Sequence, residues 1–115
     1  MKTAVITGAD GFFGSHLTKY FASNGYTVFA VVLCNSPTRS RVEGLGNTVV
    51  IPFDTLQDYE KIVPMLPMRP DVFVHLAWAG VSHESRDEID IQFGNIELGI
   101  CAVKLAARIE AERFI

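Results

Sequence analysis

Short apolar runs alternate along this chain with longer segments in which apolar and polar residues recur at helical spacing. The runs are rich in β-branched and aromatic residues, a composition typical of buried strands. We expect strands at 2–7, 27–33, 47–53 and 71–75, and the start of a fifth at 113–115. We expect helices at 12–24, 39–45 and 86–111, and another that begins after Asp54-Thr55 and ends at Pro64. The alternation predicts an α/β fold with a doubly wound parallel sheet in strand order 3-2-1-4-5.

The predicted helix at 86–111 carries more apolar residues than a single contact with a sheet requires. One stripe is expected to face the core: Ile89, Phe93, Ile96, Ile100, Val103 and Ala107. A second set lies on a neighbouring face: Ile91, Leu98, Ala102, Leu105 and Ile109. Because uncovered apolar surface usually marks a partner, we expect a homodimer through this helix. The alternative is that another part of the same protein covers it. The predicted helix at 12–24 has its apolar face at Phe13, Leu17, Tyr20 and Phe21.

The bulk composition fits one small domain spanning residues 1–115. A net charge of −3 without a cluster of Lys or Arg argues against nucleic acid or an anionic membrane as partner. The longest apolar run, from Val28 to Cys34, is too short to span a bilayer. Cys34 and Cys101 show no metal-binding or redox spacing. We therefore expect no metal site and interpret both as free, buried thiols in a reducing cytoplasm.

Three glycines follow the first predicted strand at the spacing Gly-x-x-Gly-x-x-Gly. Gly8 allows a sharp turn, Gly11 lets a pyrophosphate approach the backbone, and Gly14 lets the following helix pack close to the strand. The N–H groups near Phe12 and Phe13, in the first helical turn, are free to bind phosphate, whose charge the helix dipole favours. The pattern predicts a dinucleotide-binding site; the alternative is a glycine-rich connector without a ligand.

Two segments carry a resemblance to a known family. Thr7-Gly8-Ala9-Asp10-Gly11-Phe12-Phe13-Gly14-Ser15-His16-Leu17 resembles the cofactor loop of the extended short-chain dehydrogenase/reductases, the NAD-dependent epimerases and dehydratases of nucleotide-sugar metabolism. Val74-His75-Leu76-Ala77-Trp78-Ala79-Gly80 is similar to that family's segment after strand four. The resemblance implies a Rossmann-type fold and commonly a homodimer paired through the helix at 86–111.

The same resemblance implies contacts to the cofactor from residues that follow the third and fourth strands. Leu76, Ala77 and Trp78 would bring backbone and an apolar wall against it. Asp54 would accept a hydrogen bond from the adenine amino group, although it could instead cap the helix that follows. Asn95 resembles the residue that holds the loop after the fourth strand in place.

The end of the second predicted strand bears on the choice between NAD and NADP. An Asp or Glu there would hold the ribose hydroxyls and favour NAD, but the chain has Leu33, Cys34, Asn35 and Ser36. Arg39 and Arg41 follow, and an Arg binds a 2′-phosphate well. We expect Asn35, Ser36 and Arg39 to contact the cofactor, with NADP slightly favoured over NAD. The alternative is that both arginines are solvated helix charges.

No catalytic residue is predicted within the chain. The resembled enzymes use a Tyr-x-x-x-Lys pair, and no Tyr of this sequence is followed by Lys at that spacing. His75 is interpreted as structural and Ser82-His83-Glu84 as a solvated loop. We therefore expect the truncated cofactor-binding part of a nucleotide-sugar epimerase, dehydratase or reductase that transfers hydride between nicotinamide and a sugar carbon. Alone, this part should be inactive. The alternatives are a non-catalytic NADP-binding redox sensor and a scaffold without cofactor.

Overall fold

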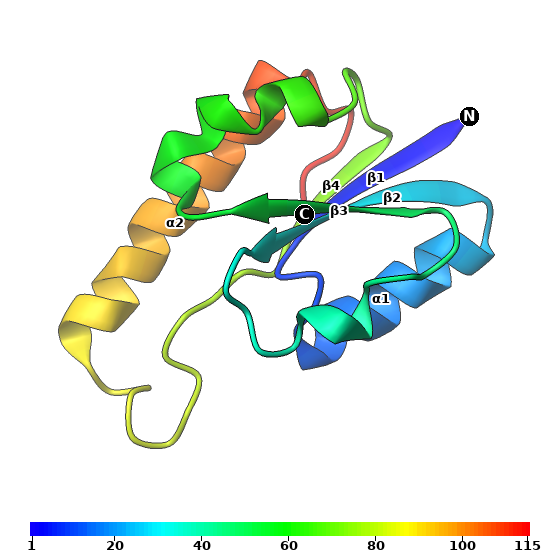
Figure 1. Ribbon diagram of the computed structural model, residues 1–115. Coiled ribbons are helices and arrows are strands. Elements are labelled where there is room, and N and C mark those ends of the chain that lie inside the picture. Colours follow the sequence, from blue (N-terminus) through cyan, green and yellow to red (C-terminus); the bar gives the residue numbers. More distant parts are fainter.

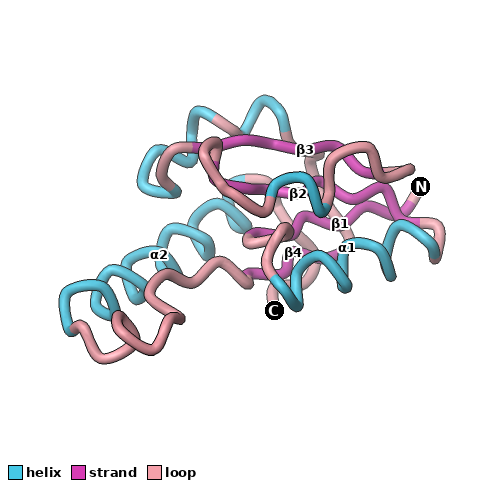
Figure 2. Tube along the Cα trace, turned by 60° about the horizontal axis from the view of Figure 1, so that its bottom comes forward, coloured by secondary structure: helices cyan, strands magenta, loops and turns pink.

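A four-stranded parallel sheet in the order β3-β2-β1-β4 forms the centre of the computed structural model, which describes residues 1–115 (Figure 2). The strands are β1 (Lys2–Thr7), β2 (Tyr26–Leu33), β3 (Thr48–Phe53) and β4 (Val72–His75). β1 pairs in parallel with β2 on one side and with β4 on the other. Beyond β4, Ile115 donates its N–H to Phe73 O at 2.9 Å, and Phe73 donates to Arg113 O at 2.8 Å. The predicted order is therefore confirmed for strands 3-2-1-4, and the start of a fifth is present beside β4 as an isolated parallel bridge between Phe73 and Phe114.

Helices cover both faces of this sheet (Figure 1). α1 (Phe12–Ser23) packs on one face, and α2 (Ile89–Arg108) with the 3-10 helix Leu56–Lys61 packs on the other. Successive strand residues point to opposite faces. In β1, Ala4 and Ile6 belong to the α1 side of the core, whereas Val5 belongs to the α2 side. Strand residues buried on both faces explain the nearly continuous apolar runs in the sequence.

Two of the predicted helices are shorter and tighter than the pattern suggested. The segment at 39–45 forms only one 3-10 turn, Arg39–Arg41. The segment after Asp54 forms two 3-10 helices, Leu56–Lys61 and Val63–Met65, and Pro64 lies in the first turn of the second rather than ending the first. The backbone of Asp58 leaves helical geometry, which interrupts any continuous α-helix there. No helix of the chain combines the length and apolar character needed to cross a bilayer.

The expected core-facing stripe of α2 is wrong. The face packed in the core is the neighbouring one, with Ala102, Leu105, Ala106 and Ile109 buried. The residues of the first stripe are more than half exposed: Ile89, Phe93, Ile96, Ile100 and Val103. Two small alanines on the inner face let α2 approach the sheet, and the first half of α2 extends beyond the sheet (Figures 1 and 2). We call these five exposed residues the outer stripe.

The apolar face expected for α1 is also partly wrong. Phe13 and Tyr20 are exposed, while Leu17 and Phe21 pack against the sheet beside buried Gly14 and Thr18. A Cβ atom at Gly14 would overlap the carbonyl oxygen of Gly8. The first turn of α1 therefore lies too close to the glycine loop for a large side chain to fit beneath it.

Candidate functional site

A cleft of about 530 Å³ opens at the carboxyl ends of the strands. After β1 the chain forms β2 on one side of that strand, whereas β4 pairs with its other side. The cleft lies at this topological switch point, where ligands bind in open α/β sheets. Its walls come from the glycine loop, the ends of β2, β3 and β4, and the first turns of α2. The lining residues are Gly8, Asp10, Gly11, Leu33, Ser36, Phe53, Asp54, Thr55, Leu56, Leu76, Ala77, Trp78, Ala79, Asp90, Ile91, Gly94, Asn95 and Leu98.

The glycine loop brings bare backbone to this cleft. Gly8 has φ +65°, and a Cβ there would lie 2.7 Å from the backbone nitrogen of Ala77, so both conformation and space require glycine. Gly11 caps α1 without a side-chain hydrogen bond and lines the cleft. The N–H groups of Phe12, Phe13 and Gly14 donate to no group of the chain. Three free donors at the positive end of a helix form a site that fits a phosphate.

The hydroxyl of Thr7 fixes the floor of the cleft. Thr7 Oγ1 accepts the N–H groups of Leu76 at 3.1 Å and Ala77 at 3.3 Å, and it lies 2.7 Å from Nδ1 of His75. Since the hydroxyl already accepts twice, its proton is donated to His75 Nδ1, which leaves the His proton on Nε2. Burial lowers the pKa of His75, which favours its neutral form. The structure thus agrees with the structural role predicted for His75.

Asn95 holds the loop after β4. It is 2% exposed; its Oδ1 accepts from Ala79 N at 2.8 Å, and its Nδ2 donates to Ala79 O at 2.9 Å. A buried side-chain amide that accepts from the N–H and donates to the C=O of one residue fixes the position of that residue. The predicted positioning role of Asn95 is therefore present in the geometry. Ser82, His83 and Glu84 are exposed beyond this loop, as expected for a solvated segment.

Asp54 lies on the opposite wall and does not cap the helix that follows. Thr55 is the N-cap residue and accepts from the N–H of Gln57 at 3.3 Å, which leaves the carboxylate of Asp54 in the cleft lining. Cys34 Sγ donates to Asp54 Oδ1 at 2.8 Å. This hydrogen bond raises the pKa of the Cys34 thiol. The prediction that Cys34 is buried is wrong: it is exposed at the end of β2, where the chain turns away from the sheet.

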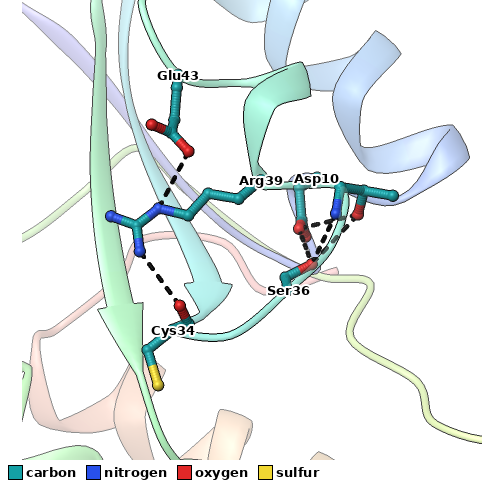
Figure 3. Close-up of polar contacts among 6 residues, drawn as sticks. Asp10, Cys34, Ser36, Arg39 and Glu43 are labelled. Carbon is teal, nitrogen blue, oxygen red and sulfur yellow. Dashed lines mark hydrogen bonds and ion pairs between the residues drawn. The ribbon is translucent and has the colours of Figure 1, made fainter.

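The loop after β2 is tied to the glycine loop through Asp10. The hydroxyls of Ser36 and Thr38 both donate to Asp10 Oδ2, the latter at 3.0 Å (Figure 3). Arg39 runs the other way, with Nη1 3.4 Å from Cys34 O and Nε 3.3 Å from Glu43 Oε1. Arg41 donates from Nη1 to Asp10 O at 3.3 Å. Neither arginine lines the cleft.

Most of the residues predicted to contact a cofactor converge on the cleft. Those that line it are Gly8, Gly11, Ser36, Asp54, Leu76, Ala77, Trp78 and Asn95. The side chains of Phe12, Phe13, Asn35 and Arg39 do not, and Gly14 acts beneath the glycine loop. The residues missed include Asp10 and Asp90. The position of Asp10 between Gly8 and Gly11 is the sequence signal that could have identified it.

The fold and the cleft together define a Rossmann-type α/β domain, the class that binds dinucleotides at its switch point. The chain belongs to the NAD dependent epimerase/dehydratase family, whose sequence pattern it matches over residues 4–115. No curated protein matches the chain.

Several solved structures of enzymes share this fold. One is the epimerase Mth375 of Methanothermobacter thermautotrophicus, with 25% identity and a TM-score of 0.81 over 98% of this chain and 34% of that one. Another is the Bordetella bronchiseptica enzyme WbmG in complex with NAD and UDP, with 20% identity and a TM-score of 0.77 over 96% and 35%. A third is the UDP-Glc/GlcNAc 4-epimerase of Campylobacter jejuni, with 17% identity and a TM-score of 0.82 over 99% and 36%. The chain thus spans about a third of the length of these proteins.

Proposed function

We propose that this chain is the nicotinamide dinucleotide-binding part of a nucleotide-sugar epimerase, dehydratase or reductase. The observation that carries the proposal is the set of three unpaired N–H groups at the start of α1, beside bare backbone at Gly11 in the switch-point cleft. These N–H groups would bind the pyrophosphate, and Asp54 would bind the adenine. Leu76 to Trp78 would form the inner wall of the site. When bound, the nicotinamide would accept and return a hydride. Family membership and the NAD and UDP named for WbmG support both the cofactor and the substrate class.

Substitution of Gly11 tests the cofactor site directly. Gly11→Val should weaken NAD or NADP binding strongly and leave the fold nearly intact, because Gly11 lines the cleft and a Cβ there meets only one atom, Gly8 O, at 3.3 Å. Calorimetric titration of the full-length protein with each nucleotide measures the effect, with circular dichroism as the check on folding. Unchanged affinity in a folded variant would exclude the glycine loop as the site.

The activity of the whole enzyme is the second part of the proposal. Residues 1–115 contain no Tyr-x-x-x-Lys pair, so the proposed general base belongs to another part of the protein. We expect no turnover of UDP-sugars by these residues alone and turnover by the full-length protein. Nucleotide binding without turnover by the full-length protein would favour the non-catalytic redox sensor instead.

The proposed enzyme is a homodimer that pairs through α2 in the cytoplasm. Support for the pairing comes from the outer stripe, a row of large apolar side chains along one exposed helix face. The preference for NADP stays a prediction, and neither Arg39 nor Arg41 lines the cleft.

A further inference from the structure

The charged side chains that line the cleft are of one sign. Three carboxylates line it, those of Asp10, Asp54 and Asp90, and no Lys, Arg or His is among the lining residues. NADP differs from NAD by one phosphate on the adenosine ribose, which adds negative charge. A cleft lined by carboxylates without a cation disfavours this phosphate, because bringing like charges together across an interface costs several kcal/mol.

Asp10 is the carboxylate whose position would allow a hydrogen bond with that ribose. The ribose lies at the end of the second strand in dinucleotide-binding sheets. Here Asp10 contacts the loop at that place, through the hydroxyls of Ser36 and Thr38, and Ser36 itself lines the cleft (Figure 3). Asp10 is 6% exposed, and the two hydroxyls hold its Oδ2 in one position.

Arg39 and Arg41, the cations that could neutralise a 2′-phosphate, make other contacts. Arg39 extends away from Asp10 and Ser36 toward Glu43 and Cys34 (Figure 3). Arg41 binds the backbone oxygen of Asp10 from outside the cleft lining. Both arginines therefore support the loops at this end of the sheet, and neither lines the cleft.

We propose that Asp10 is a specificity-determining residue that selects NAD over NADP, supplying from the glycine loop the acid that is missing at the end of β2. The carboxylate would accept a hydrogen bond from a ribose hydroxyl and repel a phosphate in its place. This proposal rests on the proposed cofactor site and opposes the sequence-based expectation of NADP.

The test compares the affinities of NAD and NADP by calorimetric titration of the full-length protein, which needs no turnover. Unmodified protein should bind NAD at least about tenfold more tightly than NADP. Asp10→Asn keeps the size of the side chain and its acceptor oxygen, and it should bring the two affinities close together, mainly by strengthening NADP binding. Asp90→Asn is the matched control: it removes the same charge from the cleft lining at the start of α2, and the preference for NAD should persist.

The possible outcomes separate the two proposals. Binding of neither nucleotide by the unmodified protein would refute the cofactor site itself. Preference of the unmodified protein for NADP, or equal shifts in Asp10→Asn and Asp90→Asn, would overturn the role of Asp10 and leave the site standing. If Asp10→Asn does not fold, the unmodified protein still tests the charge repulsion on which the proposal depends: the preference for NAD should narrow as NaCl rises from about 0.05 to 0.5 M, because salt screens repulsion. A preference independent of salt would contradict the proposal.

Discussion

A single hydroxyl, that of Thr7, joins the ends of β1 and β4 and determines the state of the histidine beside it. His75 Nδ1 accepts from this hydroxyl, while its Nε2 is buried without a partner. A second proton on the ring would turn Nδ1 into a donor that faces a hydroxyl already accepting two N–H groups. The neutral form is therefore the one that the fold stabilises.

This arrangement predicts a pH dependence of stability. Burial lowers the pKa of His75 below its ordinary 6.5 in the folded protein, so the unfolded chain binds the proton more readily. The contribution of His75 is complete above pH 6.5 and is lost as the pH falls below it, with a slope of at most about 1.4 kcal/mol per pH unit for one proton. Urea denaturation between about pH 7.5 and 5.5 measures this slope. His75→Gln should remove it, whereas His83→Gln, at an exposed position, should keep it; equal slopes in the two variants would contradict the assignment.

The thiol of Cys34 responds to a different neighbour. Its hydrogen bond to Asp54 raises its pKa, which lowers the fraction of reactive thiolate near neutral pH. In a Cys101→Ser background, Asp54→Ala should therefore accelerate alkylation of Cys34 by iodoacetamide at about pH 8. Asp58→Ala, which removes an exposed carboxylate that does not contact Cys34, is the control. A rate that is unchanged or slower in Asp54→Ala would show that the carboxylate does not suppress the thiolate.

Among the elements, the close approach of α1 to the glycine loop is the most restrictive contact. A Cβ at Gly14 would overlap a backbone oxygen, which a side-chain rearrangement cannot relieve. The glycines of α2 differ, because a Cβ at Gly99 would meet no atom within 4 Å. The same residue type is thus required in one helix and dispensable in the other.

The two helices give opposite predictions for one substitution. Gly14→Ala should lower the free energy of unfolding by about 2 kcal/mol or more, as overpacking against backbone does. Gly99→Ala should raise it by about 0.5–1 kcal/mol, because alanine restricts the unfolded chain and favours the helix. Urea denaturation of both variants measures the effects. A stable Gly14→Ala protein would mean that α1 does not pack as described.

The sequence sufficed for the strands, their order and the place of the cleft, because these follow from local patterns. The strand at 2–7 and the glycine loop after it were predicted at their observed positions. The two apolar faces of α2 could not be ranked in this way, since periodicity shows that both exist and only the sheet shows which one packs. Asp10 was missed for a similar reason: its partners, Ser36 and Thr38, are distant in sequence and meet it only in the folded chain.

For the molecule as a whole, the outer stripe is a row of large apolar side chains that the fold leaves exposed. It runs along α2 on a different face from the buried Ala102 and Leu105, and its side chains are large and branched or aromatic. Such a row is too apolar for a helix face whose only contact is water. We therefore expect it to be covered in the functional protein by a second copy.

Charge placed in the outer stripe tests the homodimer. Ile96→Glu together with Ile100→Glu should convert the full-length protein to a monomer, because two carboxylates would be buried without partners in the interface. Light scattering measures the mass, and Lys104→Glu, at an exposed polar position of the same helix, is the control that should stay dimeric. A folded double variant with the mass of the unmodified protein would assign the cover of this face to another part of the same chain.

The position of β1 in the middle of the sheet has a consequence during synthesis. β1 leaves the ribosome before its neighbours, and β2 follows soon after on one side. The other side of β1 waits for β4, which is complete only when residue 75 has been made. Until then the nascent chain carries an open strand edge whose backbone N–H and C=O groups are unpaired, a template for pairing with other chains. Translation that pauses before residue 72 would prolong this exposure, so binding of chaperones to the nascent chain should concentrate in that interval.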